Sequence, residues 1–316
     1  MKHKGKILIT GANGLVGSAL VAMLNSQGFS VVPLVRTAHL DSQVDYTPVG
    51  DLLDFDDWEP LLQGVDVIIH LAAKVHQPEP VPEQDYFSVN VDATIKIASA
   101  ARQAGIRRFI YLSTVKVNGE VTANGEKFSG SDQSSPQDAY ARSKWQAEKK
   151  LQSLFAGSDT DLVIIRPPLV YGDRARANFR KLERLARLPF PLPFAAVRNR
   201  RDMVSVLNLC ELIALCCQHS EAAQRIWMVA DEQPYSLVAL ISEMRALDDR
   251  APWLFYVPLP LLKLILWVLG KSALSDRLFA NLEVDSEPAT SILGWHPVHS
   301  FAETMRPVDL RQELNE

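Results

Sequence analysis

Cysteine is scarce in this chain: Cys210, Cys216 and Cys217 are the only thiols among 316 residues. An odd number of cysteines cannot pair completely within one chain, and the spacing of these three differs from that of a zinc knuckle. The sequence therefore indicates neither a disulfide-stapled secreted domain nor a cysteine-bound metal. We expect three reduced thiols on one core helix of a cytoplasmic protein, and no metal site.

The chain also lacks a large excess of either charge. It has 33 lysines and arginines against 37 aspartates and glutamates, and its formal net charge is −4. Proteins that bind nucleic acids usually carry a strongly basic surface, so we expect no nucleic-acid partner. Hydrophobic residues make up 47% of the sequence, which is enough to build a sizeable buried core.

No apolar run is long enough to predict a membrane-spanning helix, which needs ~20 consecutive apolar residues. The segment before Gly11 is too short for the apolar part of a signal peptide. The most apolar segment is residues 253–269, but Pro258 and Pro260 interrupt it and Lys263 divides the remainder. We expect a buried or interface helix there, and a helix that lies on a membrane surface is the second interpretation.

From residue 6 to residue 166 the sequence alternates short apolar runs, rich in valine and isoleucine, with helical patterns. This alternation predicts a parallel sheet with helices on both faces, and right-handed crossovers make it a doubly wound α/β (Rossmann) fold. The expected strands are residues 6–10, 30–35, 66–71, 109–112 and 162–166, and the expected helices are residues 15–27, 58–62, 89–103 and 138–155.

The segment "GANGLVG", residues 11–17, follows the first predicted strand and opens the first predicted helix. Glycines at that junction let the backbone approach a pyrophosphate, while the N–H groups of the helix start point toward it. We therefore expect residues 1–166 to form a dinucleotide-binding domain. Residues 167–316, which begin with frequent prolines and an arginine-rich stretch, form a smaller C-terminal substrate-binding domain, with some segments, such as a strand at 225–229, returning to the sheet.

The end of the second predicted strand selects between the two nicotinamide dinucleotides. An acidic residue there binds the ribose hydroxyls of NAD, whereas an arginine accommodates the 2′-phosphate of NADP. This strand ends in Val35, directly followed by Arg36, and holds no acid. The sequence favours NADP(H), and NAD(H) with Arg36 as a surface residue is the alternative. Asp51 is expected to accept a hydrogen bond from the adenine amino group, or else to stabilise a turn.

A tyrosine and a lysine are spaced for acid–base chemistry. Tyr140 and Lys144 are four residues apart, so on a helix they share one face. A lysine in that place can lower the phenol pKa from ~10, so that the tyrosine exchanges protons near neutral pH. Thr114, at the end of the strand predicted at 109–112, adds a hydroxyl. The glycine loop makes this combination more specific than the Tyr–Lys spacing alone.

With these motifs the chain resembles the extended short-chain dehydrogenase/reductase family, specifically the nucleotide-sugar branch of UDP-hexose 4-epimerases and UDP-4-keto-6-deoxy-N-acetylhexosamine 4-reductases. The resemblance covers nearly the whole chain and rests on "GANGLVG", "GDLLD", "HLAA", Asn90, "ST", "YARSK", "RPPLVYG" and "RDMVSV". It implies that Tyr140 exchanges a proton with the oxygen at sugar C4, that Thr114 holds this oxygen, and that Lys144 also binds the nicotinamide ribose. The expected cofactor-binding set is Gly11, Asn13, Gly14, Leu15, Val16, Arg36, Asp51, Leu52, Leu71, Ala72, Ala73, Asn90, Tyr140, Lys144 and Pro167.

The two residues after Thr114 narrow the reaction that the resemblance implies. In the family's 4,6-dehydratases an Asp-Glu pair follows the threonine and expels water, whereas Val115 and Lys116 stand here. That leaves reduction of a 4-keto group or 4-epimerisation. Epimerases of the family typically carry an aspartate where Val35 stands, so we favour reduction of a UDP-2-acetamido-2,6-dideoxy-hexos-4-ulose in surface-polysaccharide synthesis. A UDP-glucose or UDP-N-acetylglucosamine 4-epimerase with bound NAD is the alternative.

The arginine-rich stretch at residues 174–201 suits the diphosphate of a UDP-sugar, because guanidinium groups bind phosphate oxygens well. His76 is a further candidate for the sugar pocket, with a plain loop histidine as the alternative. The resemblance also leads us to expect a homodimer through the long helices, including residues 138–155. The expected substrate-binding set is Lys74, Thr114, Lys116, Asn178, Phe194, Arg201 and Arg277.

Two other function classes compete with this interpretation. A non-catalytic dinucleotide-binding regulator would keep the glycine loop but lose the Tyr–Lys pair, and both Tyr140 and Lys144 are present. A reductase of small carbonyl compounds could share the Val-Arg ending of the second strand. An uncharged ketone, however, needs no diphosphate clamp, so the basic residues after position 173 argue against that class.

Overall fold

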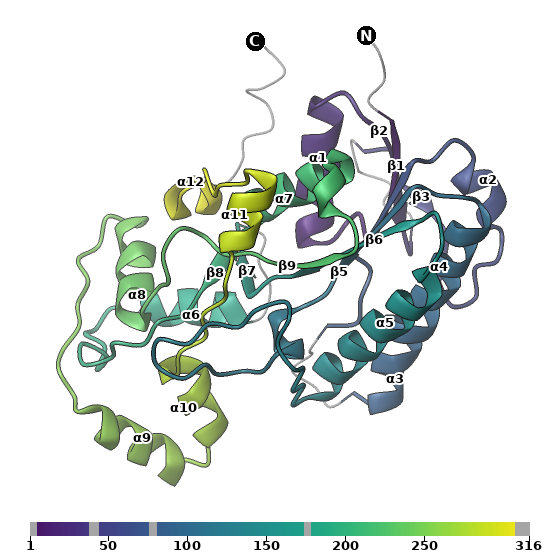
Figure 1. The fold of residues 1–316 in the computed structure, drawn as a ribbon. Helices are drawn as coiled ribbons and strands as arrows, with labels where there is room; N and C mark the ends of the chain where they lie inside the picture. Colours follow the sequence, from purple (N-terminus) through teal and green to yellow (C-terminus); the bar gives the residue numbers. More distant parts are fainter. Residues whose placement is uncertain (1–4, 38–43, 76–80, 174–177, 307–316) are drawn as a thin grey trace.

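The computed structural model describes residues 5–37, 44–75, 81–173 and 178–306. Its main feature is a seven-stranded sheet in the order β3-β2-β1-β4-β5-β6-β9, in which every neighbouring pair is parallel (Figure 1). The strand order reverses between β1 and β4, as in other doubly wound sheets. The strands are β1 (Lys6–Thr10), β2 (Ser30–Val35), β3 (Thr47–Pro48), β4 (Val67–His70), β5 (Arg108–Leu112), β6 (Asp161–Arg166) and β9 (Arg225–Met228).

Two hydrophobic cores lie on the two faces of this sheet, because successive side chains of a strand point to opposite faces. On β1, Ile7 and Ile9 join the core beneath α1 (Leu15–Ser26) and α7 (Val206–Gln218), whereas Leu8 joins the other core. That second core lies beneath α2 (Trp58–Leu62), α4 (Ala93–Gln103) and α5 (Ala139–Phe155). The predicted doubly wound α/β fold is confirmed.

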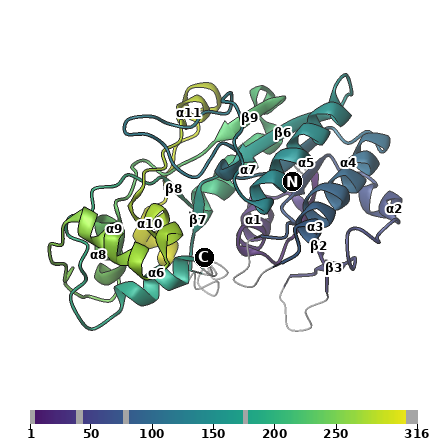
Figure 2. The same ribbon diagram turned by 90° about the horizontal axis from the view of Figure 1, so that it is seen from below.

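A third core belongs to the part of the chain after β6. A two-stranded parallel ribbon, β7 (Leu169–Tyr171) with β8 (Met203–Ser205), leads from the large sheet to a group of helices (Figure 2). Other segments after residue 166, among them α7 and β9, belong to the large sheet, so the division at residue 166 stays a prediction. The remaining helices are α6 (Asn178–Ala186), α8 (Leu237–Ala246), α9 (Leu259–Val268), α10 (Ser272–Phe279), α11 (Glu287–Leu293) and α12 (Phe301–Met305).

Two helical expectations need correction. Residues 89–103 were expected to form one α-helix, but the helix begins earlier, at α3 (Glu83–Phe87), and passes through a π-helical turn at Ser88–Asp92 before α4. Such a turn inserts an extra residue and is frequent at functional sites. The apolar segment 253–269 was expected to form a buried or interface helix, and the buried alternative is wrong, because α9 exposes most of its side chains. The three free cysteines are buried on α7, as expected.

A buried ion pair joins α5 to the end of β6. The Arg166 guanidinium donates to both carboxylate oxygens of Glu148, from Nε at 3.0 Å and from Nη2 at 2.5 Å. Ser113 donates its hydroxyl to the same carboxylate, and Arg166 Nη1 donates to the Asn118 side-chain oxygen at 2.8 Å. Both charged side chains are 3% exposed or less. These contacts fix the strand ends of β5 and β6 against α5.

Replacing Glu148 with glutamine should destabilise the protein by about 3–5 kcal/mol, because the Arg166 charge then stays buried without its counter-ion. Urea unfolding at neutral pH measures the loss. The matched control is Asp92→Asn, which removes a solvent-exposed carboxylate 3.9 Å from Lys150 and should cost less than about 1 kcal/mol. Equal, small losses in both variants would contradict the structural role of the buried pair.

Candidate active site

The glycine loop between β1 and α1 packs so closely against neighbouring backbone that its first and last glycines leave no space for a side chain. A Cβ atom on Gly17 would lie 2.3 Å from the Gly11 carbonyl oxygen, and one on Gly11 would lie 2.8 Å from the Ala72 nitrogen. Gly11 also has a φ of +68°, which glycine adopts without strain. Gly14 is the N-cap of α1, and no described side chain caps it. The N–H groups at this helix start are therefore arranged to hold an anion.

The dinucleotide-selecting position lies at the end of β2. Val35 is buried and Arg36 is exposed immediately after it. Asp51 is exposed, and its carboxylate accepts a hydrogen bond from the Leu53 N–H at 3.0 Å, which is the turn-stabilising alternative. Leu52 is half-buried against the second core.

A buried polar relay connects the glycine loop with the π-helical turn. The Ala72 N–H donates to Thr10 Oγ1 at 3.2 Å, and Thr10 Oγ1 lies 2.8 Å from His70 Nδ1. On its other side His70 Nε2 lies 2.9 Å from Thr94 Oγ1, which donates to the Asn90 carbonyl at 2.8 Å. Because Thr94 uses its proton there, His70 must carry its own proton on Nε2 and accept from Thr10 at Nδ1.

Burial, assisted by the nearby Lys144, lowers the pKa of His70 to about 3, so its ring stays neutral.

Asn90 continues the relay with its side chain. Its amide brackets the Lys74 backbone, accepting from the N–H at 2.8 Å and donating to the carbonyl at 3.0 Å, and it also donates to Ser143 Oγ at 2.9 Å. Ser143 in turn donates to the Tyr140 carbonyl at 2.8 Å. The relay therefore reaches α5 beside the catalytic candidates.

The three catalytic candidates lie together. Thr114 follows β5, and its hydroxyl lies beside the Tyr140 side chain, whose pKa it lowers. Lys144, one turn further along α5, is 2% exposed, donates to the Leu112 carbonyl at 2.8 Å and lies 4.5 Å from the centre of the Tyr111 ring. Burial and the Asp138 carboxylate raise the pKa of Tyr140 above its usual value, and the Thr114 hydroxyl opposes that rise.

The charged form of Lys144 is disfavoured by its burial. Its burial lowers the pKa of its ammonium group to about 7, although the Glu148 carboxylate one turn away acts in the opposite direction. Near neutral pH it therefore gains and loses its proton readily. A lysine of this kind can hold a hydroxyl group as a donor and supply positive charge beside Tyr140 when a proton leaves the phenol.

Lys116 is held by two carboxylates. Its ammonium lies 2.8 Å from Glu120 and 2.6 Å from Asp138. Asp138 is also the N-cap of α5, where it accepts from the Ala141 N–H at 2.7 Å. Lys116 thus connects the turn after Thr114 to the start of the helix that carries Tyr140. This positioning role was missed from the sequence alone, since Lys116 was placed in the substrate-binding set.

The other expected substrate residues lie in different parts of the structure. Lys74 forms an ion pair with Asp85 at 2.7 Å. Arg201 is half-buried. Burial lowers the pKa of its guanidinium, and the negative charge of Glu120, which also pairs with Lys116, acts in the opposite direction. The Phe194 ring lies 6.3 Å from the Phe279 ring, and Asn178 is the first residue of α6. Arg277 is exposed on α10, with no described contact to the candidate catalytic residues. His76 lies outside the described residues.

The remaining cofactor candidates surround the same strand ends. Pro167 is buried, and its carbonyl accepts from the Val115 N–H at 2.9 Å, which aligns the turn after β5 with the end of β6. Leu71, Ala72 and Ala73 are half-buried after β4. Around the glycine loop, the structure places Asn13 exposed and Leu15 and Val16 half-buried at the start of α1.

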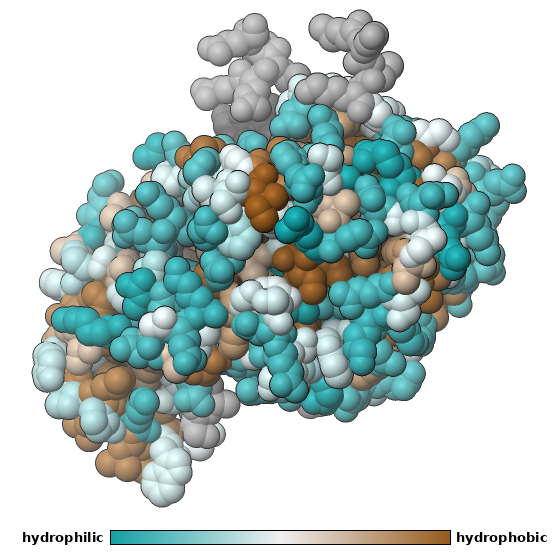
Figure 3. All heavy atoms as spheres, viewed as in Figure 1, coloured by the Kyte–Doolittle hydropathy of each residue, from teal (hydrophilic) through white to brown (hydrophobic). Residues whose placement is uncertain are grey.

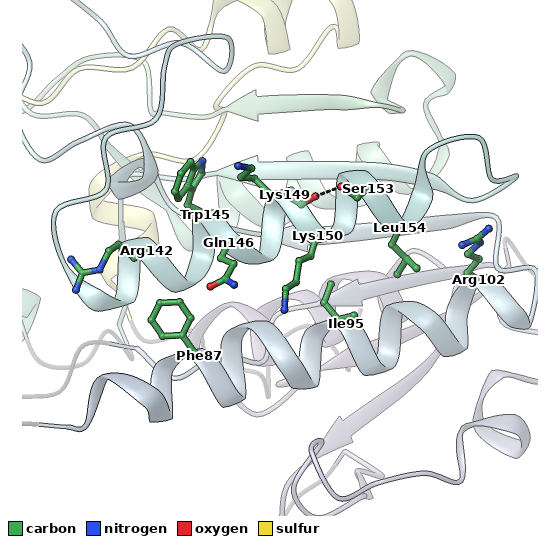
Figure 4. Close-up of a pocket in the computed structure, with 10 residues that line it drawn as sticks. All are labelled: Phe87, Ile95, Arg102, Arg142, Trp145, Gln146, Lys149, Lys150, Ser153 and Leu154. Atoms are coloured by element: carbon green, nitrogen blue, oxygen red, sulfur yellow. Dashed lines mark hydrogen bonds between the residues drawn. The ribbon is translucent and has the colours of Figure 1, made fainter.

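A surface groove lies on the outer side of α4 and α5, away from the side of α5 that buries Lys144 and Glu148 (Figure 4). Gln146 and Leu154 of α5 point toward Phe87 and Ile95, and Trp145 also lines the groove. Arginines and lysines add a polar edge. This is the surface through which the family resemblance predicts dimerisation, and that association stays a prediction.

The low pKa of Lys144 makes a testable contribution to stability. An unfolded lysine has a pKa of about 10.5, so between pH 7 and pH 10.5 the unfolded chain binds more protons at this position than the folded chain. The free energy of unfolding of the wild type should therefore rise with pH relative to that of Lys144→Met, by ~2 kcal/mol between pH 7 and pH 9. Any stability advantage of the variant should shrink by the same amount.

Urea unfolding of the dinucleotide-free proteins across this pH range measures the difference. The matched control is Lys150→Met, which replaces an exposed lysine two turns further along the same helix and should give a profile parallel to that of the wild type. A parallel profile for Lys144→Met as well would contradict the assigned pKa shift.

Comparisons with known proteins identify the family of this chain. The family model described as "NAD dependent epimerase/dehydratase family" matches residues 7–230. The chain is 37% identical to a UDP-glucose 4-epimerase of Vibrio cholerae over 307 residues, covering 96% of this chain and 94% of the relative. It is 28% identical to an N-acetyl-alpha-D-glucosaminyl-diphospho-ditrans,octacis-undecaprenol 4-epimerase of Escherichia coli O157:H7, covering 81% of this chain and 76% of that protein.

Solved structures show the same fold. A short-chain dehydrogenase/reductase superfamily protein from Agrobacterium tumefaciens, with bound NAD, matches with a TM-score of 0.76 at 20% identity and covers 95% of this chain and 94% of its own. The UDP-glucose 4-epimerase of Thermotoga maritima, solved with UDP-glucose, matches with a TM-score of 0.75 at 18% identity, covering 98% and 100%. From the matched model and the near-complete coverage by its relatives, this chain belongs to the NAD-dependent epimerase/dehydratase family of extended short-chain dehydrogenases/reductases.

Proposed function

We propose that this protein is an oxidoreductase that uses a nicotinamide dinucleotide to act at C4 of a UDP-sugar. The observation that carries the proposal is the meeting of Thr114, Tyr140 and Lys144 at the strand ends that also hold the glycine loop. Support also comes from relatives named for 4-epimerisation of sugars linked to diphosphate, and from half-buried Arg201, a cation suited to a sugar diphosphate.

The residues of this chain fit such a cofactor, because the glycine loop leaves room for backbone but not for a Cβ atom and the helix start faces outward from it. The nicotinamide, when bound, supplies or accepts the hydride. Tyr140 moves the proton to or from the C4 oxygen, and Thr114, which lies beside the tyrosine side chain, holds that oxygen. Lys144 stabilises the charge that remains on the phenol when its proton leaves.

Among the C4 reactions we favour reduction of the 4-keto group of a UDP-2-acetamido-2,6-dideoxy-hexos-4-ulose. Val115 is buried and Lys116 is bound to two carboxylates, so neither supplies the acid that dehydration requires. Val35 and the exposed Arg36 occupy the end of β2, and neither of these two described residues is an acid that could bind the ribose hydroxyls. A reductase exchanges its cofactor at every turnover, and Arg36 suits NADPH in that role.

A second candidate reaction is 4-epimerisation of a UDP-hexose with retained NAD. The observation that favours it is the 37% identity, over almost the whole chain, to a protein named as a UDP-glucose 4-epimerase. It uses the same threonine, tyrosine and lysine. The two candidates differ in what happens to the cofactor, because epimerisation consumes none.

The first experiment follows the absorbance of the reduced nicotinamide when purified protein meets enzymatically prepared UDP-4-keto-6-deoxy-N-acetylglucosamine and NADPH. We expect one NADPH oxidised per sugar reduced, and slower turnover with NADH. Interconversion of UDP-glucose and UDP-galactose without consumption, with NAD released on denaturation, would establish the epimerase instead. Turnover of a simple ketone without any effect of UDP would overturn both.

The second experiment replaces the acid–base group. Tyr140→Phe should bind the dinucleotide as the wild type does and should lose ~10²–10⁴-fold in kcat, as is usual when an acid–base group is removed. The matched control is Tyr256→Phe, since Tyr256 is 71% exposed and should keep full activity. A Tyr140→Phe enzyme with nearly normal kcat would refute the assigned role of this residue.

A further inference from the structure

The helix α9 has two apolar faces, and only one of them has a structural explanation. Leu259, Leu262 and Leu266 follow each other at helical spacing and pack against the third core. On the outer side Leu264, Trp267 and Val268 are 52%, 69% and 70% exposed. A helix that only packed on this core would need polar residues there.

Other exposed apolar side chains continue the outer face of α9. They lie on the same helix, directly after it, and in the segment just before it. Space-filling spheres show apolar residues gathered at this end of the molecule (Figure 3). We call this surface the α9 patch, and its members are Trp253, Phe255, Tyr256, Leu261, Leu264, Ile265, Trp267, Val268 and Leu269.

Single exposed apolar side chains are normal on a protein surface, but a continuous patch marks an interaction site. The α9 patch lies at the opposite end of the molecule from α4 and α5 in both ribbon views (Figures 1 and 2). It is thus separate from the groove described above. A partner that covers the α9 patch would leave that groove free.

The charges around the α9 patch indicate which partner it fits. Residues 251–275 contain no aspartate or glutamate, and their charged residues are Lys263 and Lys271, which are both exposed. If two copies of the chain met through this same segment, lysines would face lysines without any carboxylate to neutralise them. Anionic lipid headgroups supply the matching charge, and indole and phenol rings favour the boundary between headgroups and acyl chains.

We propose that the α9 patch docks the protein on the surface of an anionic membrane, with α9 lying along the interface. Its ten residues span about 15 Å, half the thickness of a bilayer core. Among the described residues no helix has the length and apolar character needed to cross a bilayer. The attachment is therefore peripheral, through apolar side chains and two lysines. It is independent of the reaction that the catalytic residues perform.

Sedimentation with sucrose-loaded vesicles tests this proposal on the full chain. The wild type should bind vesicles that contain phosphatidylglycerol more tightly than vesicles of phosphatidylcholine alone. The variant Leu264→Ser/Trp267→Ser/Val268→Ser should lower the partition coefficient at least ~100-fold, since each buried apolar side chain is worth about a factor of ten or more. The charge variant Lys263→Gln/Lys271→Gln should reduce binding to the anionic vesicles alone.

The matched control is Val298→Ser, which removes an apolar side chain that is 69% exposed outside the α9 patch and should leave vesicle binding unchanged. The thermal midpoint of each variant shows that it is folded, because the changed side chains lie on the surface. Wild-type protein that stays in the supernatant with anionic vesicles would overturn the proposal. So would a dimer that the triple variant converts to a monomer, which would make the α9 patch an interface between copies.

Discussion

The buried contact between Arg166 and Glu148 is the interaction on which the site depends. It joins the end of β6 to the middle of α5, and Ser113 and Asn118 add the strand end and turn that surround Thr114. Because α5 carries Tyr140, Lys144 and Glu148 at successive turns of one face, this contact fixes the rotation of the helix as well as its distance from the sheet. A buried ion pair is costly to desolvate, so its contribution here is the position of the candidate catalytic groups more than net stability.

The polar relay through His70 complements that ion pair from the other side. It runs from the strand end of β1 through Thr94 to Asn90, and from there to α5 by way of Ser143. Every step uses a side chain whose donors and acceptors are matched, and the imidazole stays neutral. The glycine loop and the catalytic helix are thereby held in one frame, although they are separated by more than a hundred residues of sequence.

Much of this could be predicted from the sequence, because it depended on local patterns. The Val/Ile-rich runs predicted β1, β2, β4, β5, β6 and β9, and the Tyr–Lys spacing predicted that both residues lie on one helix. The relay, the Arg166–Glu148 contact and the ion pairs of Lys116 could not be predicted, since periodicity says nothing about which distant side chains meet. The π-helical turn at Ser88–Asp92 contains Asn90, which pairs with the Lys74 backbone, and a local pattern does not reveal such a partner. Whether α9 is buried or exposed could not be decided from the sequence, because an apolar run gives no information on whether a neighbour covers it.

The last strand of the sheet has a consequence for the order in which the chain folds. Val163 of β6 pairs with Arg225 of β9, so during synthesis the edge of β6 remains unpaired until the ribosome has completed the segment that contains β9. Parallel pairing of this kind closes a long loop and forms slowly, and an unpaired strand edge attracts other chains in the meantime. The edge that becomes protected last is that of β6, which ends in Arg166. Nascent chains that end before residue 225 would therefore expose a strand edge that is open to aggregation.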